Sequence, residues 1–106
     1  MFLAKVIGSV VATKKDGSMT GHKLLLVRPM LVDPHNPAAF KPGSNTIVAI
    51  DTLGAGEGEL VLLAQGSSAR QADGLKNLPA DAAIVGLVDS VRVLGQATYE
   101  GGKTQL

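Results

Sequence analysis

The sequence has no cysteine and no long hydrophobic run, and each absence excludes a class of protein. Without cysteine the chain can form neither a disulfide framework nor a thiolate metal site, which fits a reducing compartment. No apolar segment approaches the roughly 20 residues that a helix needs to cross a bilayer. The opening Met1–Lys5 reaches a charge too early for the apolar region of a secretory signal. We therefore expect a soluble, cytoplasmic protein without a membrane partner.

Aromatic residues are scarce as well, at 3% of 106 residues, although hydrophobic residues make up 45%. The core must therefore be built from valine, leucine, isoleucine and alanine, with Phe2, Phe40 and Tyr99 as the only aromatic rings. A chain of this length forms one domain, and burial contributes about 25 cal/mol per Å² of apolar area. Burial of one face against identical copies would add to this stabilisation, so we expect oligomerisation.

The net charge is only +1, and the basic residues do not cluster. The longest basic run is Lys14–Lys15. Proteins that bind nucleic acid bring several lysines and arginines together, often beside aromatic side chains on which bases stack. The composition therefore argues against nucleic acid or an anionic membrane as the main partner.

Short aliphatic and β-branched segments, separated by turn residues, predict an all-β fold. Five segments are the strand candidates: Phe2–Thr13, Lys23–Arg28, Thr46–Asp51, Glu59–Gln65 and Ala82–Val93. Several short strands with turn signals and almost no helix are typical of a small barrel or sandwich. We place one compact domain at residues 1–95 and a C-terminal tail at residues 96–106.

The connections between these segments carry strong turn and breaker signals. Lys14–Ser18 contains an Asp-Gly pair, which favours a hairpin turn, and Pro29 is predicted to stop the second strand. Met30–Asn45 holds three further prolines and is predicted to be a loop. Ser67–Asp73 could form at most one short helical turn with a serine cap. The polar Glu100–Leu106 is expected to fray.

The densest glycine cluster is Gly54–Glu59, with the sequence GAGEGE. Glycine-rich loops can wrap a phosphate in backbone amides, but that arrangement needs a following helix and a Lys, Ser or Thr that completes the site. Here a strand candidate follows, no lysine is near, and two carboxylates would repel a phosphate. We favour a tight connection in which glycine permits positive φ or close approach of another backbone. That backbone could belong to another subunit.

No other residues form a recognisable catalytic or metal-binding pattern. His22 and His35 are the only histidines, and their spacing from each other and from Asp33 does not suggest a zinc site. Ser67–Ser68 lacks a nucleophile elbow and a positioned base, and Arg70 beside it is expected to serve in a cap or salt bridge. Carboxylates at strand ends and in loops are interpreted as solvated or capping groups: Asp51, Glu57, Glu59, Asp81 and Asp89. We therefore expect no enzyme activity, no metal and no cofactor.

Several of these segments together resemble one known family. The segments that carry the resemblance are Met1–Thr13, Lys23–Val27, Val48–Glu59, Gln65–Arg70 and Pro79–Asp89, which follow in the family's order through residues 1–94. The pair formed by Gly-Ala-Gly-x-Gly-Glu and Gly-Ser-Ser-Ala-Arg, at this separation, is the most specific part. The chain is similar to the vertex proteins of bacterial microcompartments, of the carboxysome and ethanolamine-utilisation type.

The resemblance implies a five-stranded barrel of oligonucleotide/oligosaccharide-binding (OB) type that assembles as a homopentamer. It also implies a structural role, in which the pentamers cap the vertices of a polyhedral shell and adjoin hexameric or pseudohexameric shell proteins. Residues expected at the subunit interface or near the axial channel are Gly54, Ala55, Gly56, Gly58, Glu59, Ser67, Ser68 and Arg70. A Gly56→Val change is expected to disfavour any positive φ there and to crowd the junction. The chain departs from the commoner pattern in Asp33–Asn45 and in the tail after Gly95, which are plausible contacts with a neighbouring tile.

Two other functions remain open on the sequence alone. An OB-type module could bind nucleic acid or oligosaccharide, but it would need exposed aromatic side chains and a basic groove. An enzyme or nucleotide-binding protein could use the glycine loop. We favour the pentameric vertex subunit over both.

Overall fold

The computed structural model describes residues 1–12, 22–66 and 81–101. The turn predicted at Lys14–Ser18 and the helical turn predicted at Ser67–Asp73 lie outside the described residues. None of the residues in the described part of the chain belongs to an α-helix. No helix among them is long and apolar enough to span a membrane.

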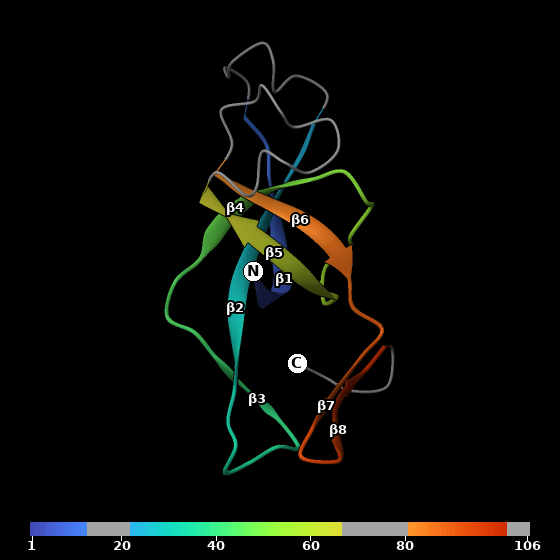
Figure 1. Cartoon of the computed structure of the whole chain (residues 1–106). Coiled ribbons are helices and arrows are strands. Elements are labelled where there is room, and N and C mark those ends of the chain that lie inside the picture. Colours follow the sequence, from blue (N-terminus) through green and yellow to red (C-terminus); the bar gives the residue numbers. More distant parts are fainter. Residues whose placement is uncertain (13–21, 67–80, 102–106) are drawn as a thin grey trace.

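The described part of the chain consists of strands and their connections (Figure 1). The strands are β1 (Phe2–Val10), β2 (Lys23–Val32), β3 (Phe40–Pro42), β4 (Ile47–Asp51), β5 (Leu60–Gln65), β6 (Ala82–Leu87), β7 (Ser90–Val93) and β8 (Gln96–Glu100). All five predicted strand segments contain a strand. The predicted all-β fold is confirmed.

Five of these strands close into a barrel. The pairing order is β1-β5-β6-β4-β2, and an additional pairing of β2 with β1 joins the two ends. The β4–β6 pair is parallel, whereas the other pairs of the barrel are antiparallel. Closure leaves the barrel without an open edge that could pair with another chain. The predicted five-stranded barrel is confirmed.

Alternate residues of these strands point into one aliphatic core, because successive side chains of a strand lie on opposite faces. The buried core cluster consists of Ala4, Val6, Leu25, Val27, Ala49, Ala55, Val61, Leu63, Ala82 and Ile84. No aromatic residue belongs to this buried set, and Phe2 packs against its edge. The core therefore has the composition that the shortage of aromatic residues predicted.

The predicted end of the second strand at Pro29 is wrong. Strand β2 runs through Pro29 to Val32 and pairs with β3 beyond it. Proline cannot donate a backbone hydrogen bond, but its carbonyl can accept one. The Pro29 carbonyl accepts a hydrogen bond from the Gly43 amide at 2.8 Å, so the strand continues past the proline. The predicted loop Met30–Asn45 therefore contains the end of β2 and all of β3.

The last predicted strand, Ala82–Val93, is divided in two. It breaks between β6 and β7, where the Val88 amide donates to the Leu60 carbonyl at 3.0 Å. Strand β7 then pairs with β8 through a turn in which Leu94 and Gly95 both have positive φ, 51° and 79°. Part of the segment predicted as a tail is thus a paired strand.

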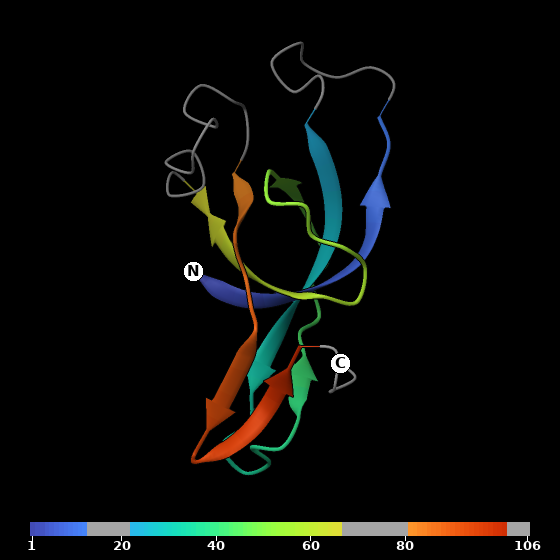
Figure 2. The same cartoon turned by 90° about the vertical axis from the view of Figure 1, so that its right-hand side faces the viewer.

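The β7–β8 hairpin and the β2–β3 extension form a second, smaller lobe beside the barrel (Figure 2). Met30, Leu60 and Tyr99 make its buried cluster, against which Phe40 and Val91 pack. The Thr98 hydroxyl donates a hydrogen bond to the Pro37 carbonyl, which ties β8 to the segment between β2 and β3. The lobe thus joins segments far apart in the sequence.

We predict that Tyr99→Ala destabilises the fold, since Tyr99 is only 5% exposed and fills the centre of this lobe. Removal of a large buried ring costs about 3–5 kcal/mol. Urea unfolding at one fixed protein concentration measures the loss. The exposed Gln96→Ala on the same strand is the control and should change stability by less than about 0.5 kcal/mol. Equal losses in both variants would contradict the packing described here.

Candidate assembly site at the glycine loop

The glycine loop, residues 54–59, connects β4 to β5 and is fastened to β1. The Gly58 amide donates to the Val6 carbonyl at 2.8 Å, and the Val6 amide donates to the Glu59 carbonyl at 3.0 Å. Ala55 is fully buried in the barrel core. The loop is therefore part of the barrel wall.

Asp51, the last residue of β4, holds the start of the loop. The residue is 5% exposed, and its carboxylate accepts hydrogen bonds from the Leu53 amide at 2.9 Å and the Ala55 amide at 2.8 Å. The Lys23 ammonium group donates to the Ala55 carbonyl at 3.0 Å from the neighbouring strand β2. Asp51 is thus the capping carboxylate that the sequence suggested in general terms. The contribution of Lys23 was missed, because nothing in the sequence places it beside Ala55.

The glycines of the loop have different roles. Gly54 and Gly58 have φ values of 85° and 87°, a region that side chains with a Cβ atom rarely adopt. Gly56 does not have a positive φ. The expectation that a valine at this position would be disfavoured by a positive φ is therefore wrong. At Gly56 the limit is space, since an added Cβ would lie 3.0 Å from the Oε1 atom of Glu59. That oxygen accepts a hydrogen bond from the Gly56 amide at 2.6 Å.

Few backbone amides of this loop are free to donate a hydrogen bond to a phosphate. The amides of Leu53, Ala55, Gly56, Gly58 and Glu59 all donate to acceptors within the chain. A phosphate-binding loop instead aims its backbone amides at the ligand. The geometry therefore argues against the nucleotide-binding interpretation, as the two carboxylates of the sequence already did.

The other candidate groups are spread over the molecule. Within residues 1–12, 22–66 and 81–101, no three histidines or carboxylates lie close enough to hold a metal ion. The Asp33 carboxylate accepts a hydrogen bond from the backbone amide of His35 at 2.9 Å in an exposed turn. Asp81 and Asp89 are exposed at opposite ends of the segment that contains β6. These residues do not form a common site.

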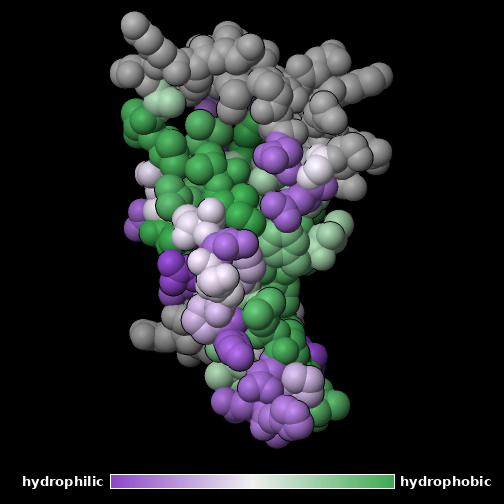
Figure 3. All heavy atoms as spheres, turned by 90° about the vertical axis from the view of Figure 1, so that its left-hand side faces the viewer, coloured by the Kyte–Doolittle hydropathy of each residue, from purple (hydrophilic) through white to green (hydrophobic). Residues whose placement is uncertain are grey.

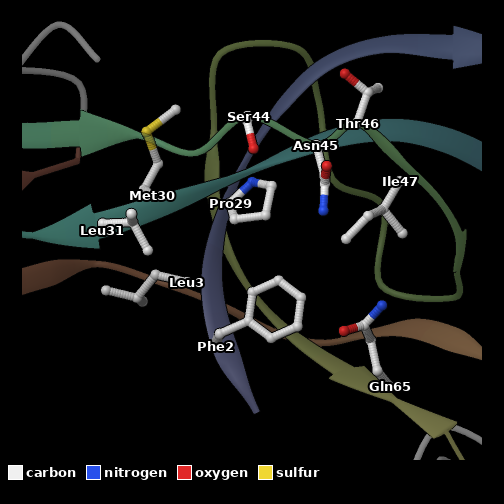
Figure 4. Close-up of a pocket in the computed structure, with 10 residues that line it drawn as sticks. All are labelled: Phe2, Leu3, Pro29, Met30, Leu31, Ser44, Asn45, Thr46, Ile47 and Gln65. Atoms are coloured by element: carbon white, nitrogen blue, oxygen red, sulfur yellow. The ribbon is translucent and has the colours of Figure 1, made fainter.

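A groove of about 580 Å³ lies beside the N-terminal end of β1 (Figure 4). It is lined by Phe2, Leu3, Pro29, Met30, Leu31, Ser44, Asn45, Thr46, Ile47 and Gln65. None of these lining residues is an acid, a base or a histidine, so the groove offers no pair of groups for general acid–base chemistry.

The structure brings together five of the residues predicted at the interface or channel. Gly54, Ala55, Gly56, Gly58 and Glu59 form one loop, and all except Ala55 and Gly56 are exposed. Ser67, Ser68 and Arg70 lie outside the described residues.

Known proteins similar to this chain share both its sequence and its fold. Residues 1–89 match the family model described as ethanolamine utilisation protein EutN/carboxysome. The bacterial microcompartment shell vertex protein PduN of Salmonella typhimurium is 50% identical over 91 residues, covering 86% of this chain and 98% of that protein. The carboxysome shell vertex protein CcmL of a Synechocystis species is 43% identical over 99 residues and 93% of each chain.

Solved structures extend the likeness to the arrangement of the strands. GrpN, a pentameric microcompartment shell protein from Rhodospirillum rubrum, aligns with a TM-score of 0.74 and 44% identity over 89% of this chain and 100% of that chain. CcmL of Gloeobacter violaceus aligns with a TM-score of 0.81 and 38% identity over 95% and 98% of the two chains.

We predict that Asp51→Asn destabilises the protein by about 1–3 kcal/mol, because an amide offers one oxygen where the carboxylate accepts from two amides. The nitrogen of the asparagine would face one of those buried donors. Asp33→Asn is the matched control, since its carboxylate accepts one bond in an exposed turn, and we expect little change there. Denaturant unfolding compares the two variants. A control that loses as much stability as Asp51→Asn would refute the role given to Asp51.

We also predict that Gly58→Ala costs more stability than Gly56→Ala. An alanine at φ 87° pays the penalty of the left-handed region, about 1–2 kcal/mol. At Gly56 the added methyl group meets only the end of the flexible Glu59 side chain, which can move. Thermal unfolding of both variants at equal concentration tests the order, and a less stable Gly56→Ala would show that space in the loop matters more than backbone conformation.

Proposed function

The chain belongs to the EutN/carboxysome protein family, and on that premise we propose that it is a structural shell protein whose pentamers cap the vertices of a polyhedral bacterial microcompartment. The observation that carries this proposal is the likeness to the pentameric shell protein GrpN at 44% identity over 100% of that chain. The likeness covers most of the present chain, so it includes the barrel and does not rest on one motif.

The five-fold ring has a geometric reason. Flat layers of six-fold tiles carry no curvature, so a closed polyhedron needs five-fold units at its corners. A cyclic ring forms through head-to-tail contacts, in which each subunit presents two different surfaces. Hexameric or pseudohexameric shell proteins are the tiles that would surround each pentamer. Asp33–Asn45 and the C-terminal end of the chain are the segments that we propose touch them.

We propose that the glycine loop lies at the subunit interface or near the axial channel of this ring. Its small residues allow another backbone to approach, and Gly54, Gly58 and Glu59 are exposed in the isolated subunit. Ser67, Ser68 and Arg70 would form a second contact element, as the family resemblance implies.

We further propose that the subunit has no catalytic role. The carboxylate of Asp51 and that of Glu59 accept hydrogen bonds from the loop backbone, which gives both groups a structural use. PduN and CcmL are both named as shell vertex proteins, which supports the structural role over an OB-type module for nucleic acid or oligosaccharide.

We predict that shells assembled without this chain have open corners, whereas shells assembled with it are closed. Electron microscopy of shells purified from cells that express the tiles with or without the chain tests this prediction. Native mass spectrometry of the purified chain should give the mass of five copies. Closed shells without the chain or any substitute, or a chain that stays monomeric at micromolar concentration, would overturn the proposed function.

A further inference from the structure

We infer that the ring forms when the outer face of β4 and β2 in one subunit packs against the glycine loop of the next copy, with Arg28 paired to Glu57. This inference rests on the proposed function, because it names the two surfaces that a pentamer of this chain would join. It is carried by the places of these surfaces on the barrel, by their polarity and by the opposite charges that border them.

Strand β4 lies on the side of the barrel opposite the glycine loop, and β2 lies between β4 and β1. In the closed order, β4 has β2 and β6 as neighbours, so β1 and β5 are each two strands away from it. The glycine loop is bonded to β1 at Val6 and leads directly into β5. Figure 1 shows β4 on the left of the barrel and the loop on the right. Surfaces on opposite sides of a subunit suit a head-to-tail ring.

The outer face of β4 and β2 is apolar. Val48 on β4 is 49% exposed, and Leu26 lies directly opposite it on β2, half-buried. Figure 3 shows hydrophobic residues gathered on the side of the molecule on which β4 lies in Figure 1. The outer side of an antiparallel sheet is normally polar where it faces water. Leu24 and Ile50 on the same face are buried, at 7% and 2% exposure, so the open part of the face is its end at Val48 and Leu26. An open apolar area suits a contact surface.

A positive charge borders the patch on the same outer face. Arg28 follows Leu26 by two residues on β2, so both side chains leave the same face of the strand. Its Nε atom is buried and has no hydrogen-bond partner in the part of the chain that the structure describes. Arg28 as a whole is partly exposed, so a carboxylate from a second subunit would pair with the accessible part of its side chain and not with the enclosed Nε atom.

The glycine loop supplies a matching carboxylate. Glu57 is exposed at the turn of the loop, and no described residue forms a hydrogen bond or ion pair with its carboxylate. The carboxylate of Glu59, by contrast, accepts a hydrogen bond from the Gly56 amide within the loop. A guanidinium and a carboxylate form strong charge-assisted hydrogen bonds, so Glu57 is the partner that we assign to Arg28.

The occupant of the apolar face is therefore a second copy of this chain. One chain carries an apolar face edged by a cation and, across the barrel, a loop with an exposed anion, so the two surfaces complement each other. The similar protein GrpN is pentameric, which agrees with repetition of one such contact around a ring.

A charge-swap experiment tests the pairing. Arg28→Glu and Glu57→Lys are each expected to raise about tenfold or more the protein concentration at which half of the rings dissociate, because each places two like charges at every junction. The double variant carrying both changes should return most of the way to the unchanged protein. Lys41→Glu, the same change of charge on the exposed strand β3, is the control and should assemble normally. Native mass spectrometry over a dilution series measures all five proteins.

The outcomes separate the inference from the proposed function. An unchanged chain that is not pentameric overturns the proposed function and the inference together. A pentameric chain whose Arg28→Glu variant assembles like Lys41→Glu overturns the inference alone. If the double variant remains as dissociated as the single ones, the assigned pairing is also overturned.

Disulfide cross-linking tests the same subunit contact by a second route, which does not require a variant that assembles less tightly. The chain has no cysteine of its own, so Val48→Cys with Glu57→Cys introduces the only two thiols. The two positions lie across the barrel, and cysteines whose Cα atoms are more than about 7 Å apart cannot bond within one subunit. Mild oxidation should therefore produce a ladder of linked chains up to five on a non-reducing gel. Val48→Cys with Leu94→Cys, at the hairpin tip, is the control, and a similar ladder from it would contradict the contact.

Discussion

Two hydrogen bonds to the buried carboxylate of Asp51 fix the turn between β4 and the glycine loop, and the position of the loop in the barrel depends on this turn. They turn the chain at the end of β4 and place Ala55 in the core, so the glycine loop becomes part of the barrel wall. The loop then bonds to β1 on its way to β5. The turn thus leads the chain from β4, which pairs with β6, to β5, which pairs with β1.

This barrel has apolar residues on both faces of some of its strands, and that arrangement connects stability with assembly. The inner face is filled by small aliphatic side chains, while Val48 and Leu26 leave apolar area on the outer face. Water is a poor environment for such a surface, and a neighbouring subunit is a better one. In the proposed ring, a neighbouring copy would cover this outer surface.

Several features of the fold could be predicted because they depend on residues close together in the sequence. The alternation of aliphatic residues identified the barrel strands, and the glycine cluster identified a tight connection after β4. The prediction failed at Pro29, where a bond from the distant Gly43 lets the strand continue, and between β6 and β7, where β5 supplies the acceptor. It also failed for the backbone of Gly56, because glycine alone does not reveal which member of a cluster has positive φ.

The sequence by itself determined the all-β class, the aliphatic core, the absence of disulfides and, through its paired glycine and serine motifs, the family of this protein. Only the tertiary structure decided that Lys23 supports the glycine loop, that the β7–β8 hairpin and the β2–β3 extension form a second lobe, and that the loop and the outer face of β4 lie across the barrel from each other. The physical reason is that strand pairing around a closed barrel joins residues dozens of positions apart. Their mutual placement follows from the order of the strands, which local patterns do not contain.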